Sequence, residues 1–121
     1  MTIKEKRKER LLAELKNKEY RDAFVSANVD VGVAFQIRAL RDQRNWNQTE
    51  LAKRANMHQE RISALENPSH SPTLATLKKL ASAFDVGLMV RFVPISKLVG
   101  YELNLDSTAI EAQGFDQENE G

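Results

Sequence analysis

The side chains best able to do chemistry are Ser63 and the two histidines, His58 and His70. Ser63 follows Ile62 in a helical pattern, with no His or Lys positioned to activate its hydroxyl. Isolated histidines without accompanying ligands make a poor metal site. The chain has no glycine-rich phosphate loop and no pair of carboxylates at a recognisable catalytic spacing. These residues argue against an enzyme, and they indicate no metal and no cofactor.

Length and composition exclude several further classes of protein. The 121 residues suffice for one domain with a short appendage. The absence of cysteine excludes disulfides, thiolate zinc sites and iron–sulfur clusters. No run approaches the ~18 apolar residues of a membrane span, and the charged start, residues 1–8, lacks the apolar segment of a signal peptide. We therefore expect a cytoplasmic protein without a membrane partner.

Charge is unevenly distributed although the net charge is only +1. Residues 1–21 hold eight Lys/Arg against four Asp/Glu, residues 22–97 hold ten against seven, and residues 98–121 hold none against six. A basic body with an acidic tail suits an anionic partner, most often nucleic acid, although a protein with a disordered acidic end would look the same. The run from Lys4 to Arg10 is more typical of a solvated helix face, but it could add phosphate contacts.

Helical periodicity predicts the elements that must position these residues. A charged helix over residues 4–18 should precede a second from about residue 19. A bend or a loosely wound joint is expected at Asp30–Val33, followed by a helix ending near residue 44. Asn47 and Thr73 are good caps for two further helices. The expected core consists of Ile37, Leu40, Trp46, Leu51, Ile62, Leu65, Leu74, Leu77 and Phe84.

The sharpest pattern is a helix, a three-residue turn and a second helix between Gln48 and Asn67. Ala52 is small enough for a steep helix crossing, and Asn56 tolerates the left-handed conformation of a tight turn. Inward Ile62 and Leu65 would leave the outer face of the second helix, beginning at Gln59, free to enter a major groove.

A short strand is predicted after the helices. Leu88–Val93 combines β-branched and aromatic residues and ends at Pro94. Because one strand is not stable alone, it must pair with another chain, a second copy or the tail. Tyr101–Leu105 alternates and could pair by a hairpin through residues 97–100; beyond Asp106 we expect disorder.

Residues Gln48–Asn67, followed by Pro72-Thr73-Leu74, resemble the Xre/Cro-like helix-turn-helix family of bacterial and phage repressors. The shared features include the Leu-Ala pair at 51–52, the Ile-Ser step at 62–63 and Glu66 before the loop. More loosely, Lys16–Pro94 is similar to HigA-type antitoxins. The resemblance implies an all-α, lambda-repressor-like helix-turn-helix bundle with an N-terminal helical extension and a short C-terminal β-strand. The expected divisions are residues 1–31 (extension), 32–86 (DNA-binding domain), 87–105 (strands, a dimerisation candidate) and 106–121 (acidic disordered tail).

The resemblance also implies roles for individual residues. Gln48 would bind a phosphate, whereas Gln59 suits an adenine, Arg61 a guanine and Glu60 a cytosine amino group. The full set of implied DNA-binding residues is Gln48, Thr49, Gln59, Glu60, Arg61, Ser63 and Asn67. Arg41 and Glu66 match a structural ion pair that braces the fold in this family.

Two positions depart from the family pattern. Asn56 stands where the family usually has Gly in the turn, and His58 stands where the second helix usually has a Ser or Thr cap. Neither departure removes the motif.

The sequence thus predicts a sequence-specific regulator of transcription, a repressor, that binds double-stranded DNA as a homodimer on a pseudo-palindromic operator. The alternative is an antitoxin that neutralises a small basic toxin, a RelE-like endoribonuclease, and autoregulates its operon. A third option is an adaptor that keeps the fold without DNA affinity.

Overall fold

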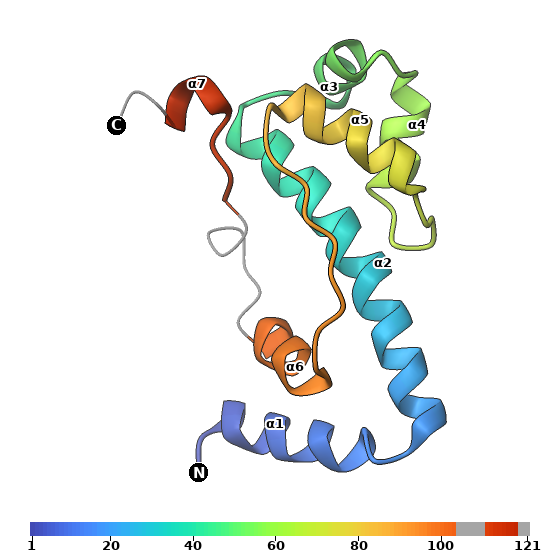
Figure 1. Cartoon of the computed structure of the whole chain (residues 1–121), viewed down its shortest axis with the longest axis vertical. Helices are drawn as coiled ribbons and strands as arrows, with labels where there is room; N and C mark the ends of the chain where they lie inside the picture. Colours follow the sequence, from blue (N-terminus) through green and yellow to red (C-terminus); the bar gives the residue numbers. More distant parts are fainter. Residues whose placement is uncertain (104–110, 119–121) are drawn as a thin grey trace.

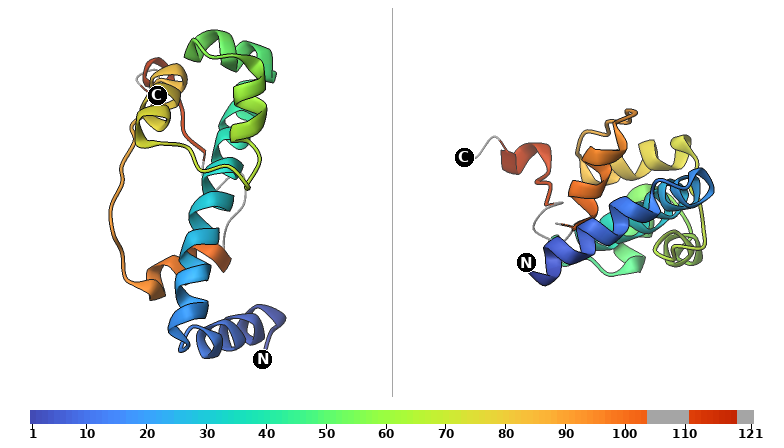
Figure 2. Two further views of the ribbon diagram at one scale, coloured as in Figure 1. Left: turned by 90° about the vertical axis from the view of Figure 1, so that its right-hand side faces the viewer. Right: turned by 90° about the horizontal axis from the view of Figure 1, so that it is seen from below.

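The computed structural model describes residues 1–103 and 111–118, and all regular elements in these ranges are α-helices (Figure 1). In chain order they are α1 (Ile3–Glu14), α2 (Lys18–Gln43), α3 (Gln48–Ala55), α4 (Gln59–Leu65), α5 (Leu74–Phe84), α6 (Ile95–Leu103) and α7 (Phe115–Glu118). The long helix α2 connects two ends of the molecule: α3, α4 and α5 pack at one end, and α1 and α6 lie at the other (Figures 1 and 2).

Short-range hydrogen bonds explain where the helices begin and end. The side chain of Asn47 accepts from the backbone N–H of Glu50 at 2.8 Å, and Thr73 accepts from that of Thr76 at 3.1 Å, so α3 and α5 begin at the predicted caps. Asn56 and Asp85 adopt left-handed conformations after α3 and α5. These residues terminate the helices because their short polar side chains tolerate that conformation.

The core lies between the C-terminal half of α2 and the helices α3 to α5. The fully enclosed side chains Leu51, Ile62 and Leu65 come from α3 and α4, and Ile37 and Phe84 close the core from α2 and α5. The Trp46 ring stacks on Phe84, with ring centroids 6.0 Å apart. A second, smaller packed region at the other end of α2 buries Leu15 and Val99.

Helix α2 runs without interruption through Gly32, so the bend expected at Asp30–Val33 is wrong. A glycine weakens a helix by only about 1 kcal/mol, and burial of Ala34 and Ile37 in the following turn holds the backbone helical. Helix α2, with 26 residues, is also long enough for a membrane span, and an 18-residue window of it has a mean hydropathy of 1.2, which by itself is weak evidence for a span. Because the C-terminal half of α2 contributes Ile37 to the domain core, we assign α2 as a core helix.

The predicted strand at Leu88–Val93 is wrong. This segment is extended, but no β-strand occurs among the described residues, and the segment runs alone between α5 and α6 (Figure 1). Its β-branched residues favour extended backbone, whereas a strand also needs a neighbouring edge to hydrogen-bond. The hairpin partner is missing because Tyr101–Leu103 belongs to α6. The remaining residues of that expected partner, 104–105, lie outside the described ranges.

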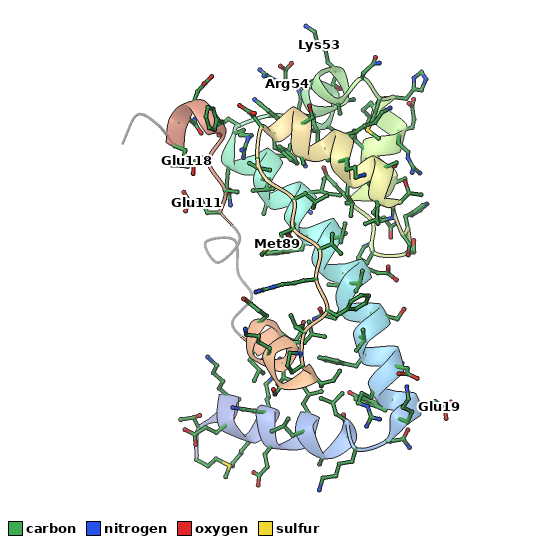
Figure 3. All side chains as sticks on the ribbon, viewed as in Figure 1. Glu19, Lys53, Arg54, Met89, Glu111 and Glu118 are labelled. Atoms are coloured by element: carbon green, nitrogen blue, oxygen red, sulfur yellow. The ribbon has the colours of Figure 1, made fainter. Side chains whose placement is uncertain are left out.

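Residues 111–118 lie against the C-terminal end of α5. The backbone N–H of Phe115 donates to the carbonyl of Asp85 at 3.0 Å, and α7 follows. This arrangement differs from the disorder expected after Asp106; the other residues of that tail, 106–110 and 119–121, lie outside the described ranges. The exposed acids Glu111 and Glu118 point away from the side of the molecule that carries α4 (Figure 3).

Candidate nucleic-acid interface

A tight turn presents α4 on α3. Asn56 takes φ 54° and ψ 50°, and the backbone N–H of Met57 then bonds to the carbonyl of Ala52 at 2.8 Å. Ala52 and Ala55 are buried at the crossing, where a larger side chain would separate the helices. The inner residues of α4 are the completely buried Ile62 and the nearly buried Leu65, so the opposite face of α4 is left to solvent.

A chain of hydrogen bonds links the outer face of α4 to the rest of the domain. Gln59 Nε2 donates to Gln48 Oε1 at 2.7 Å, and Gln48 Nε2 donates to Glu66 Oε1 at 3.3 Å. Glu66 is held in turn by Arg41, with Nε–Oε2 at 2.7 Å and Nη2–Oε1 at 2.9 Å. The structure therefore brings together two predicted DNA-contacting glutamines and the predicted ion pair.

The Arg41–Glu66 pair is a fork-to-fork contact between two largely buried side chains, 12% and 6% exposed. The hydrogen bond to Glu66 raises the pKa of Arg41, while burial acts in the opposite direction. Arg41 Nη1 also donates to the carbonyl of Trp46 at 2.9 Å, which fixes the connection between α2 and α3. This pair braces the interface from inside.

The remaining predicted contact residues lie on the surface. Exposed side chains are those of Thr49, Gln59, Glu60, Arg61, Ser63 and Asn67. Arg61 forms no ion pair with any residue that the structure describes, so its guanidinium is available to a ligand. His58 begins α4 without a side-chain cap bond, as its type suggested.

The loop after α4 is held by its own side chains. Asn67 Oδ1 accepts from the backbone N–H and the hydroxyl of Ser69, at 3.0 and 2.8 Å. Ser71 Oγ donates to Asp30 Oδ1 at 2.7 Å, which ties the loop to α2. Asn67 thus keeps its amide N–H groups for a further partner beside α4.

Two arginines that the sequence reasoning did not single out support this region. Arg54 lies over the Trp46 ring at 4.1 Å and bonds to Glu50 at 2.8 Å; its α3 neighbour Lys53 projects into solvent (Figure 3). The Glu50–Arg54 spacing of four residues was the available signal. Arg44 is enclosed near Trp46 and Phe84, and burial lowers its pKa. No local pattern marks Arg44, because its bonds to the carbonyls of Phe84 and Ala112 join segments that are distant in sequence.

Comparison with known proteins agrees with this geometry. A helix-turn-helix family model matches residues 37–89, which include the C-terminal end of α2, all of α3 to α5 and the start of the extended segment. No curated protein and no solved structure shows a significant match to the chain. Helix-turn-helix domains of this family bind DNA and are typically non-enzymatic. Residues 37–89 are therefore similar to an Xre-like helix-turn-helix domain, and this match supports a DNA-binding regulator of transcription.

Proposed function

We propose that the protein is a sequence-specific repressor that places α4 in the major groove of its operator. The observation that carries this proposal is the exposed polar face of α4, whose opposite face is completely buried against α3 and the core. Such a helix is fixed in orientation, and its side chains can meet base edges without any rearrangement of the fold. The proposal includes a cytoplasmic location for the protein.

The residues on that face have complementary roles. Gln59 and Arg61 read adenine and guanine edges by paired hydrogen bonds, and Glu60 accepts from a cytosine amino group. Ser63 contacts a base or a flanking phosphate. Gln48, Thr49 and Asn67, at the first turn of α3 and in the loop after α4, bind phosphates and set the register of α4. The 2.7 Å bond between Gln59 and Gln48 supports this division, because it couples a base contact to a phosphate contact.

The proposal is tested by fluorescence anisotropy with the duplex upstream of the protein's own gene and an unrelated duplex as competitor. The variant Gln59→Ala/Arg61→Ala is expected to lose about 2 kcal/mol or more of preference, roughly 30-fold, because each bidentate base contact is worth about 1–3 kcal/mol. The matched control Gln36→Ala/Arg38→Ala removes the same side-chain types from exposed positions of α2 and should keep the preference. Equal binding of wild type to both duplexes would refute sequence-specific recognition.

We further propose that the protein binds as a homodimer. One helix of seven residues reads few base pairs, and a second copy related by a two-fold axis doubles the site. Met89, Val90 and Phe92, which are 75%, 66% and 107% exposed, support an apolar contact between copies. Met89→Ser/Phe92→Ser should weaken the dimer, so that the average mass measured by sedimentation equilibrium falls from that of a dimer towards that of a monomer. A wild-type monomer well above the concentrations that bind DNA would contradict the homodimer.

An antitoxin role is the second candidate. The exposed apolar residues Val29, Val31 and Phe35 on α2 lie outside the groove-facing helix and suit a protein partner. The exposed acidic side chains among residues 111–118 suit a basic protein partner. Co-expression with a small basic protein encoded beside the gene should yield a stable complex, and rescue of growth by this chain would distinguish an antitoxin from a stand-alone repressor.

A further inference from the structure

The C-terminal segment, residues 111–118, is docked on the end of α5 (Figure 1). The backbone N–H of Phe115 donates to the carbonyl of Asp85 at 3.0 Å. Gly114 approaches the end of α5 closely, because a Cβ at this position would lie 3.4 Å from the carbonyl oxygen of Phe84. These contacts fix the start of α7 at the end of α5.

Arg44 holds the same segment from the end of α2. Its Nη2 donates to the carbonyl of Ala112 at 2.8 Å and to that of Phe84 at 3.0 Å, and its Nη1 donates to that of Leu40 at 3.1 Å. Arg44 forms no ion pair with the described residues, and burial lowers its pKa because no carboxylate offsets the desolvation. A partly buried charge needs its hydrogen bonds to be made. The carbonyl of Ala112 therefore supplies one of the three acceptors that keep this guanidinium in place.

Residues 44–47 connect α2 to α3, and Arg44 is the first of them. The Arg44 guanidinium lies 5.7 Å from the centroid of the Trp46 ring, which stacks on Phe84. The backbone N–H of Trp46 donates to the carbonyl of Arg41 at 3.2 Å, and the carbonyl of Trp46 accepts from Arg41 Nη1 at 2.9 Å. The connection is therefore held between Arg44 on one side and Arg41 on the other.

Arg41 links this connection to the predicted DNA-contacting glutamines. Its guanidinium bonds to Glu66 at 2.7 and 2.9 Å, Glu66 accepts from Gln48 at 3.3 Å, and Gln48 accepts from Gln59 at 2.7 Å. Gln48 opens α3 directly after the connection, so its position also follows from the backbone of that connection. The C-terminal segment and the first residue of α4 therefore lie at the two ends of one continuous series of contacts.

We propose that the C-terminal segment positions the glutamines that read DNA. Docked on Arg44, it holds the connection between α2 and α3, and with it Gln48 and Gln59, in the geometry that α4 needs to read bases. The proposal rests on the proposed function of α4. It adds to α4 a positioning element outside residues 37–89, the part of the chain that the family model matches. Coupling of this kind requires contiguous contacts whose arrangement changes when one end is released.

A purely electrostatic role of the segment predicts a different effect. Its exposed acids, Glu111, Asp116 and Glu118, would repel the phosphates of every duplex equally if the segment were released. Affinity for both duplexes would then fall together. A loss of preference for one duplex over the other therefore reports positioning and not charge.

The test compares two pairs of substitutions at the same positions of the full chain. Gly114→Val/Phe115→Pro should undock the segment. The valine branches would collide with the carbonyl of Phe84, and proline has no N–H to donate to Asp85. Proline suits the first position of α7, so the helix itself is kept. Gly114→Ala/Phe115→Ala is the matched control, because its added Cβ lies at an ordinary contact distance and the N–H of residue 115 remains.

The first measurement needs no DNA. In NMR spectra of the free protein, the side-chain amide signals of Gln48 and Gln59 should shift in the undocking variant and stay at the wild-type positions in the alanine control. Arg44→Lys, which removes the bond to Ala112 from the side of α2, should shift the same signals. The fluorescence of Trp46, the single tryptophan of the chain, should change as well, because Arg44 lies beside its ring. Glutamine signals that stay unshifted in both variants would overturn the proposal.

The second measurement is the preference for the duplex upstream of the gene over an unrelated duplex, by fluorescence anisotropy. The undocking variant should lose roughly 3- to 10-fold of this preference, and the alanine control should keep it. Gln48→Ala interrupts the series of contacts, so undocking in that background should cause no further loss. An equal loss with and without the Gln48 side chain would show that the segment acts by another route, and would overturn the proposal.

Failure of the proposed function gives a different result. If wild type binds both duplexes equally, the sequence-specific role of α4 is refuted, and the glutamine signals of the free protein still decide whether the segment positions Gln48 and Gln59. If wild type prefers its own duplex and the undocking variant keeps that preference, the positioning role is overturned while the role of α4 stands.

Discussion

Glu66 lies at the centre of the bonds that hold the candidate interface. Its carboxylate accepts from Arg41 through two hydrogen bonds and from Gln48, which in turn accepts from Gln59. Charge-assisted, bidentate bonds of this type are directional as well as strong. The orientation of Gln59, the first residue of α4, therefore depends on the Arg41–Glu66 pair, which lies inside the domain and not on the exposed face of α4.

Removing one member of the Arg41–Glu66 pair should lower the stability of the domain. Arg41→Met leaves the Glu66 carboxylate, 6% exposed, without its cationic partner, and should lower the free energy of unfolding by about 3 kcal/mol. Urea denaturation measures the loss. Arg38→Met on the same helix, where the ion pair is exposed and 3.8 Å long, should cost less than about 0.5 kcal/mol. Arg41→Met/Glu66→Leu should recover part of the loss, and a double variant as unstable as the sum of the single ones would contradict this reasoning.

At the scale of the element, α2 is the main support of the molecule. It supplies Ile37 to the core at one end and carries α1 at the other, so the position of α1 relative to the domain core depends on the continuity of α2. Gly32 is its weakest point in propensity, because glycine loses the most backbone freedom in a helix. A Cβ at Gly32 would meet nothing within 4 Å.

Substitutions at Gly32 should therefore show whether α2 is a continuous helix at this position. Gly32→Ala should raise the free energy of unfolding by about 0.5–1 kcal/mol and keep the helical circular dichroism signal. Gly32→Pro should lower it by about 3 kcal/mol or more, because proline removes a helical hydrogen bond and clashes with the preceding turn. A bend at this position would tolerate proline, so equal thermal stability of the two variants would restore the bend predicted from the sequence.

At the scale of the whole molecule, Arg44 joins segments that are far apart in the chain. Its Nη2 donates to the carbonyl of Phe84 at 3.0 Å and to that of Ala112 at 2.8 Å, and its Nη1 donates to that of Leu40 at 3.1 Å. The guanidinium thus connects α2, α5 and the residues before α7. The acidic residues 111–118 are kept beside the end of α5, away from α4 (Figure 3).

Arg44→Lys should release this connection, because an ammonium group cannot reach three carbonyls with the planar geometry of a guanidinium. We expect a loss of about 1–2 kcal/mol in the free energy of unfolding, and faster hydrogen exchange of the Phe115 amide, which bonds to Asp85. Arg54→Lys is the matched control, since Arg54 also lies over Trp46 but bonds only to Glu50 of its own helix. Unchanged Phe115 exchange in Arg44→Lys would show that Ala112 is held by other contacts.

The sequence by itself determined the local features of the domain: the caps at Asn47 and Thr73, the left-handed turn at Asn56 and the buried inner face at Ile62 and Leu65. These depend on residues a few positions apart, so propensity, capping and the 3.6-residue period are sufficient to predict them. The face of α4 that would read DNA follows from the same periodicity, since it is the side opposite the buried residues.

Only the tertiary structure decided the features that depend on distant neighbours. Gly32 is helical because Ala34 and Ile37, which follow it in α2, are buried, and Leu88–Val93 is not a strand because no described segment offers it an edge. Arg44 reaches Ala112, 68 positions away in the chain, and the bond from Arg21 to the carbonyl of Leu15 fixes the corner between α1 and α2. In each case the free energy comes from contacts between segments, which local sequence patterns do not contain.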